Sequence, residues 1–128
     1  MSRVAAFLGF TNTLRAKALR EASDYVELET CHALLVVPRS RVRSRGQETR
    51  IMFRPESAEV TLRREKPSQL EGVLTGLLFQ GRSLRARVIT EQGEVEASVP
   101  RPERQLELRG RLGGKVYVDL TAEELMIF

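Results

Sequence analysis

The sequence predicts an all-β protein built from two small five-stranded barrels that share a core. Two observations carry this prediction. Short runs of alternating apolar and polar residues are separated by glycine and proline turns, which is the pattern of half-buried strands. The order of these runs also occurs twice within the 128 residues. Because a unit of roughly 60 residues buries little surface alone, we expect the two copies to pack against each other.

Ten strands follow from the alternation, which is clear where Val95 and Ala97 flank Glu96. The pair Gln92-Gly93 lies between two such runs and suits a hairpin turn, because glycine adopts a positive φ readily. Ahead of the strands, residues 4–10 are expected to form a short helical turn that ends near Gly9. The expected strands span residues 14–20, 24–30, 33–37, 48–54, 58–63, 70–79, 83–90, 94–99, 115–120 and 124–128.

The internal repeat defines the two copies. Residues 25–38 parallel residues 85–100, and residues 48–56 parallel residues 115–123, with a polar, arginine-bearing loop between the paired segments in each copy. Two five-strand units indicate either two OB-like barrels or one interleaved pair. The best boundary follows Lys66-Pro67, so that the first half covers residues 13–67 and the second half residues 68–128.

Composition sets limits on the class of protein. The chain has 21 Lys and Arg against 17 Asp and Glu, and this mild basic excess permits an anionic partner without requiring one. The single cysteine, Cys31, excludes an internal disulfide and favours a reducing compartment. The apolar run over residues 4–8 is far shorter than the ~20 residues of a membrane span.

Nothing in the sequence predicts catalysis, a cofactor or a metal. The segment from Gly110 to Lys115 lacks the spacing of a phosphate-binding loop, and Val116 stands where a hydroxyl would hold magnesium. Cys31 and His32 are the only residues of their kinds, and neighbours in a strand point to opposite faces. They therefore predict neither a nucleophile with its base nor a zinc site. The carboxylates are interpreted as surface charges at Glu103, Glu107, Glu123 and Glu124.

Four arginines in seven residues, Arg39, Arg41, Arg43 and Arg45, lie between two expected strands. They are weak candidates for contact with an anion or a partner, although a solvated loop is the favoured interpretation. Binding of nucleic acid by an OB face also needs aromatic side chains on which bases stack. The chain has no Trp and two Tyr, which argues against a nucleic-acid partner.

Several motifs, in order, resemble one family. Residues 4–12 resemble the motif VAxFLGxxN, residues 46–56 resemble a G…IRPE passage, and residues 70–81 resemble LxGxVxxxxFxG. These motifs belong to the C-terminal region, called TOBE, of bacterial and archaeal ABC import ATPases of the maltose, spermidine, ferric-iron, sulfate and molybdate type. One departure is the turn Thr30-Cys31-His32, where the family usually carries glycine. The family-motif residues are Gly9, Asn12, Arg54, Pro55, Glu56, Gly72 and Gly81.

The resemblance implies a non-catalytic regulatory and dimerisation domain of an ATP-binding subunit, with residues 1–12 as the remnant of the linker from the ATPase domain. It implies a homodimer formed through the parent ATPase, membrane permease subunits, and a regulatory protein or the transported solute as further partners. The place would be the cytoplasm, at the inner face of the cell membrane. The alternative is a free-standing binder of an oxyanion such as molybdate or tungstate, with Thr11, Asn12 and Ser83 as candidate donors.

Overall fold

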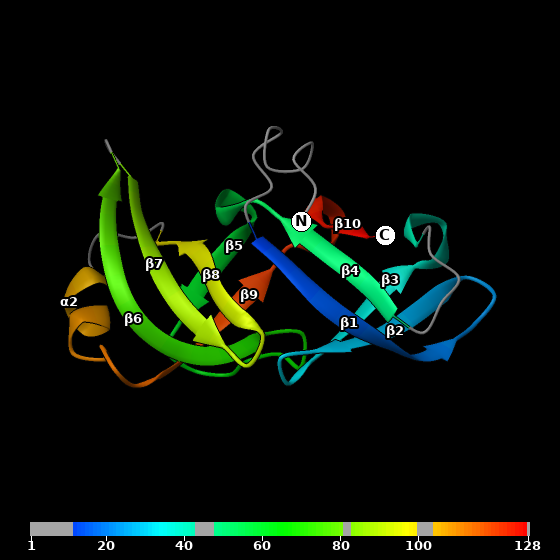
Figure 1. Ribbon diagram of the computed structural model, residues 1–128, viewed down its shortest axis with the longest axis horizontal. Coiled ribbons are helices and arrows are strands. Elements are labelled where there is room, and N and C mark those ends of the chain that lie inside the picture. The colour runs from blue at the N-terminus through cyan, green and yellow to red at the C-terminus, as the bar shows by residue number, and fades with distance from the viewer. Residues whose placement is uncertain (1–11, 43–47, 81–82, 100–103, 128) are drawn as a thin grey trace.

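A computed structural model describes residues 12–42, 48–80, 83–99 and 104–127, and over these ranges the protein is all-β with one short α-helix. An open, curled sheet and a closed barrel lie side by side (Figure 1). The strands are β1 (Asn12–Glu21), β2 (Tyr25–Thr30), β3 (Ala33–Pro38), β4 (Glu48–Phe53), β5 (Ala58–Thr61), β6 (Leu70–Gln80), β7 (Ser83–Thr90), β8 (Gly93–Ser98), β9 (Lys115–Leu120) and β10 (Met126–Ile127). Each predicted strand is present, with ends displaced by a few residues.

The open sheet has the strand order β10-β4-β1-β2-β3, and every neighbouring pair is antiparallel. Its curled form makes it half a barrel. Its inner face is apolar because every second side chain points inward: Ile51 and Phe53 of β4 are completely buried, beside Leu14 of β1. Phe53 therefore faces the core.

The second sheet is a closed barrel with the order β5-β8-β7-β6-β9. A single parallel contact closes it, where Glu59 of β5 lies beside Ser98 of β8. The Ser98 hydroxyl donates to the Ala58 carbonyl at 2.7 Å, which adds a bond at the point where the backbone ladder is shortest. Closure removes the free strand edges from this half of the molecule.

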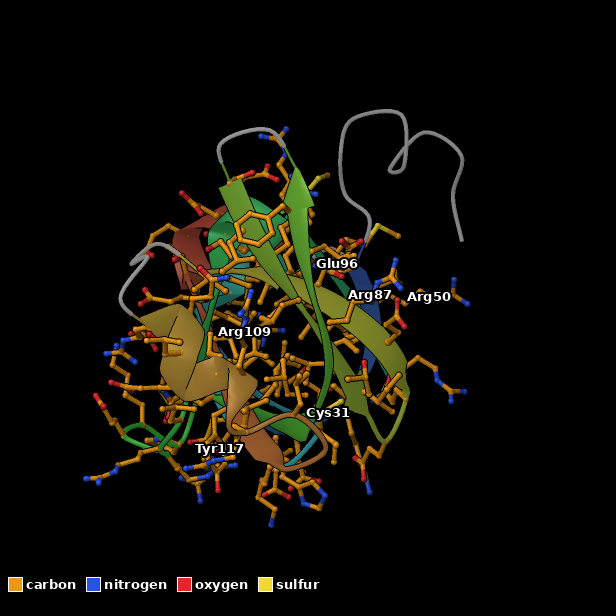
Figure 2. The ribbon with its side chains drawn as sticks, turned by 90° about the vertical axis from the view of Figure 1, so that its left-hand side faces the viewer. Cys31, Arg50, Arg87, Glu96, Arg109 and Tyr117 are labelled. Carbon is orange, nitrogen blue, oxygen red and sulfur yellow. The ribbon has the colours of Figure 1, made fainter. Side chains whose placement is uncertain are left out.

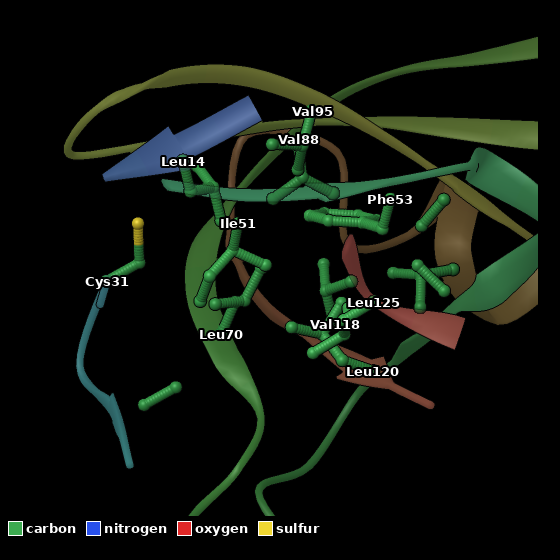
Figure 3. Packing of buried hydrophobic residues seen from close by; sticks show 14 of the residues in the cluster. Leu14, Cys31, Ile51, Phe53, Leu70, Val88, Val95, Val118, Leu120 and Leu125 are labelled. Atoms are coloured by element: carbon green, nitrogen blue, oxygen red, sulfur yellow. The ribbon is translucent and has the colours of Figure 1, made fainter. Parts of the chain in front are cut away.

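The two halves are interleaved, which is one of the two arrangements left open by the sequence. Strand β5 comes from residues 13–67 and completes the barrel, whereas β10 comes from residues 68–128 and pairs with β4. One continuous core therefore runs through both sheets, and Figure 3 shows Leu14, Phe53, Val88 and Val118 packed within it. The expectation of a shared core is confirmed.

The corner after β4 turns the chain from the open sheet into the barrel. Pro55 is the first residue of the 3₁₀ helix η2 (Pro55–Ser57), where its missing N–H costs no bond, and its side chain is buried. The Glu56 carboxylate accepts a hydrogen bond from the Arg85 guanidinium at 2.7 Å, which ties the corner to β7. Arg54 is extended and exposed. Gly9, Gly81 and the expected helical turn over residues 4–10 lie outside the described residues.

The helix α2 (Arg104–Arg109) occupies a segment that the sequence predicts as a polar loop. Its six residues make less than two turns, and only Leu108 is buried, so no helical repeat of apolar residues marks it. The turn expected after it is present: the Gly114 N–H donates to the Arg111 carbonyl at 2.8 Å, and Gly113 has φ +82°. Two further 3₁₀ turns are η1 (Arg39–Arg41) and η3 (Ala122–Glu124).

Candidate functional site

A polar hollow of about 650 Å³ lies where β1 meets two hairpin turns, one from each half of the chain. We call it the junction pocket. Its walls come from β1, from the turn between β2 and β3, and from the turn between β7 and β8. The residues that line it are Arg15, Ala16, Lys17, Glu29, Thr30, Cys31, His32, Glu91 and Gln92.

The register of β1 explains why a hollow forms here. Strand β4 pairs with residues 12–17 of β1, whereas β2 pairs only with residues 17–21. The backbone at the start of β1 therefore has no β2 residue beside it. A buried backbone N–H or C=O needs another partner in that situation.

A side-chain amide supplies that partner. The Gln92 Oε1 accepts from the Arg15 N–H at 2.6 Å, and the Gln92 Nε2 donates to the Arg15 carbonyl at 2.6 Å. Gln92 thus bonds β1 as one residue of a neighbouring strand would. The Thr30 hydroxyl joins this group, since it donates to the Arg15 carbonyl at 2.7 Å and lies 3.1 Å from Gln92 Nε2.

Each half of the chain also supplies hydrogen-bonding groups to the backbone of the other half. Cys31, in the first half, accepts at its carbonyl from the N–H of Glu71 in β6 at 3.0 Å. Asn12 of β1 makes two bonds to the backbone of Glu96 in β8, one to the N–H and one to the C=O, both 2.8 Å long. Groups from each half therefore satisfy the backbone of the other, and the junction pocket lies between them.

The turn between β2 and β3 is built on unusual backbone angles. Cys31 has φ +46° and His32 has φ +64°, a left-handed conformation that costs energy for residues other than glycine. Two successive residues of this kind form the turn that best suits a two-residue hairpin. They also separate the two side chains: Cys31 is buried at the edge of the core (Figure 3), and His32 is exposed.

Two cations of β1 line the pocket, and the second of them, Lys17, stands directly opposite Glu29 of β2. Arg15 and Lys17 are two residues apart on β1, so both side chains lie on one face, and neither makes an ion pair with any residue that the structure describes. Arg50 stands directly opposite Arg15 on β4 and points away from the molecule (Figure 2). Like charges opposite each other weaken a sheet, which makes an anionic ligand favourable at this place.

Acidic groups also line the pocket. Glu29 of β2 is exposed on its rim, and Glu91 lies 3.4 Å from the His32 imidazole, measured from Oε2 to Nε2. With His32 neutral, two cations and two carboxylates leave the lining with no net charge. Over the described residues no group of three or more His, Cys, Asp or Glu could hold a metal ion.

The sequence-predicted candidates fall elsewhere. Arg39 donates to the Ala22 carbonyl at 3.1 Å, and Arg41 donates to the Leu125 carbonyl at 3.2 Å. These arginines bond backbone of their own chain, and Arg43 and Arg45 lie outside the described residues. Asn12 is buried, and both ends of its amide are bonded to Glu96.

The remaining candidates do not gather at the pocket either. Ser83 is exposed at the start of β7 and does not line the pocket. Glu107, Glu123 and Glu124 are exposed, in keeping with surface charge. Thr11 and Glu103 lie outside the described residues.

Sequence reasoning missed Arg15, Lys17 and Gln92 as pocket residues. One signal was available, namely the turn Thr30-Cys31-His32 at a place where glycine is expected. A second was the match between that turn and the turn from Thr90 to Gln92 in the other copy.

The fold belongs to the OB-like β-barrel class, with a closed barrel beside a curled half-barrel. No family model and no curated protein matches the sequence. Among solved structures, the chain is similar to the cytoplasmic molybdate-binding protein ModG with molybdate bound, at 16% identity and a TM-score of 0.65, over 91% of this chain and 94% of that chain. This likeness shows the fold. Within the described residues, no helix has the length and apolar character needed to cross a membrane.

Proposed function

We propose that this protein is a non-catalytic, ligand-binding module that binds a small oxyanion of the molybdate or tungstate type in the junction pocket. The observation that carries the proposal is the pair of cations Arg15 and Lys17, which line the hollow from β1 and make no ion pair with any described residue. Hydrogen bonds from guanidinium and ammonium groups to an oxyanion are charge-assisted, which makes them stronger than neutral bonds.

The other pocket residues position these two cations. Gln92 and Thr30 are bonded to the Arg15 backbone, so they hold the start of β1 in place while its side chains reach the ligand. Arg15 offers a planar fork of N–H groups, and Lys17 offers a compact charge. The backbone from which Arg15 projects is therefore fixed before a ligand binds, which lowers the ordering cost of binding. The likeness in fold to a molybdate-binding protein of nearly the same extent supports the proposal.

Isothermal titration with molybdate, tungstate, sulfate and phosphate tests it. We expect saturable binding by at least one of these anions, and a loss of at least tenfold in affinity for the variant Arg15→Ala/Lys17→Ala. Arg20→Ala is the matched control, because Arg20 is an exposed cation of the same strand that does not line the pocket. Absence of binding for every anion, or an equal loss in the control, would refute the proposal.

A finer proposal places the module within an importer. On the resemblance of residues 4–12, 46–56 and 70–81, it would be the C-terminal regulatory domain of an ABC import ATPase. Its partners would be a second copy joined through the ATPase, the membrane permease subunits, and a regulatory protein or the solute. Such a domain would work in the cytoplasm at the inner face of the cell membrane.

Two measurements test the finer proposal. The DNA upstream of the coding region should contain an in-frame GxxxxGK[ST] motif, because that loop binds the ATP phosphates in the ATPase domain. The chain itself should show no saturable ATP binding in calorimetry. An upstream region without an open reading frame would leave the oxyanion binder as a free-standing protein.

A further inference from the structure

His32 stands on the rim of the junction pocket and touches both halves of the molecule. Its Nε2 lies 3.4 Å from a carboxylate oxygen of Glu91 and 3.8 Å from one of Glu71. Glu91 belongs to the turn between β7 and β8, and Glu71 belongs to β6, so both carboxylates come from the barrel while His32 comes from the open sheet. The oxyanion binding proposed above assigns no role to this imidazole.

The charge of the pocket depends on His32. The lining carries two cations, Arg15 and Lys17, and two carboxylates, Glu29 and Glu91. With a neutral imidazole these charges cancel, and with a protonated imidazole the lining becomes positive by one unit. Histidine is the side chain that ordinarily changes charge between roughly pH 5 and pH 8. A proton on His32 therefore changes the net charge of the lining from zero to +1.

We propose that the junction pocket takes its oxyanion together with one proton, which resides on His32. This inference rests on the oxyanion binding proposed above and names its regulation. Two effects favour the proton when the anion is present. The anion attracts the imidazolium directly, and the imidazolium in turn offsets the repulsion between the anion and the carboxylates of Glu29 and Glu91. Because binding linkage is reciprocal, a lower pH then strengthens anion binding.

Besides Glu91, several charged residues from neighbouring strands and turns lie near His32. Glu71 also pairs with Lys115 of β9, with 3.5 Å between Oε1 and Nζ, so one of its oxygens is already partly neutralised. Arg64, in the segment before β6, donates to the His32 carbonyl at 3.2 Å. Glu65 and Lys66 line the neighbouring hollow that His32 also borders, and Lys66 pairs with Asp119 at 3.4 Å. Glu91 is the nearest carboxylate and has no second partner among the described residues. It is therefore the main ion-pair partner of a protonated His32.

The backbone conformation of the turn fixes where the His32 side chain lies. His32 and its neighbour Cys31 both hold a left-handed conformation that glycine or asparagine adopts at lower cost. Such strain persists where the surrounding structure enforces it, and it gathers at functional sites. The conformation puts the imidazole of His32 between two carboxylates of the other half.

Titration of the whole chain with molybdate at about pH 6 and about pH 8 tests the inference. For the wild type we expect affinity to be roughly tenfold higher at the lower pH, as one added charge at short range predicts. His32→Asn is the matched variant, because asparagine tolerates the left-handed conformation but does not titrate. It should bind with the same affinity at both pH values, close to that of the wild type at the higher pH.

Three further experiments test proton uptake even if His32→Asn folds poorly. Calorimetry of the wild type in two buffers of different ionisation enthalpy should show proton uptake on binding. The NMR titration midpoint of His32, the only histidine, should move to higher pH when molybdate saturates the protein. Glu91→Gln should raise affinity at about pH 8 several-fold, because it removes one negative charge from the lining.

The outcomes separate the inference from the proposed function. Binding that is equal at both pH values, or a pH dependence that His32→Asn retains, overturns the inference and leaves oxyanion binding intact. Binding that is absent at both pH values refutes the proposed function, and the inference falls with it. Uptake of one proton, lost in His32→Asn, supports both.

Discussion

Among the described glycines, Gly72 is the one at which an added methyl group would meet the closest neighbouring atoms. An added Cβ would lie 2.5 Å from Val88 Cγ1 and 2.7 Å from the Ile89 carbonyl oxygen, and the second of these atoms belongs to the backbone of β7. Neither strand can move far, because the barrel is closed on both sides of the pair. Forcing extra atoms into packed space costs about 1–3 kcal/mol, and the lower entropy of an unfolded alanine returns only about 0.4–1 kcal/mol. We therefore expect Gly72→Ala to destabilise the fold by about 1–2 kcal/mol.

Gly76 provides the control on the same strand. A Cβ there would meet nothing within 4 Å, and its φ is not positive, so only the entropy gain remains. Gly76→Ala should thus stabilise the fold by about 0.4–1 kcal/mol. Urea unfolding measures both changes. With a slope of about 1–3 kcal/mol per molar, the midpoint should fall by about 0.3–2 M for Gly72→Ala and rise by about 0.1–1 M for Gly76→Ala. Equal shifts for both variants would refute the close approach of β6 and β7.

Three other substitutions test the core and the hydrogen bonds that join distant segments of the chain, each by urea unfolding. Phe53→Ala should lower the free energy of unfolding by about 3–5 kcal/mol, because the side chain is completely buried, and an unchanged midpoint would place it on the wrong face. Asn12→Ala should cost about 2 kcal/mol by leaving two backbone groups of Glu96 without partners, whereas a loss below ~0.5 kcal/mol would show that water replaces the amide. Arg41→Ser should cost about 1 kcal/mol through its bond to Leu125, and a neutral result would restore the solvated-loop interpretation.

The strands were predictable because their information is local. The alternation at Val95 and Ala97 and the hairpin turn at Gly93 can both be recognised from a few neighbouring residues of the sequence. The helix α2 was not predictable, because six residues with one buried leucine give no helical period. Its Leu106 is 77% exposed and contributes nothing to an amphipathic pattern.

The interleaving and the pocket depend on contacts between distant residues. A chain-order boundary after Pro67 separates two similar halves, yet β5 and β10 each pair with the half on the other side of it. The bond between Arg15 and Gln92 spans 77 positions, and neither residue is unusual in its own segment. Periodicity carries no signal for such a pair, since it describes which face a residue occupies and not which strand lies beside it.

The same exchange of strands accounts for the place of the pocket. Strand β5 closes the barrel and is therefore not available to the first half, whose sheet stays open. On the side of β2, the backbone at the start of β1 is left beside the side chain of Gln92 instead of a strand. Side chains fill less space than a strand, so a hollow remains beside Arg15. A ligand at this place contacts both halves at once. We therefore expect binding to stabilise the contact between the two halves, and not either barrel alone.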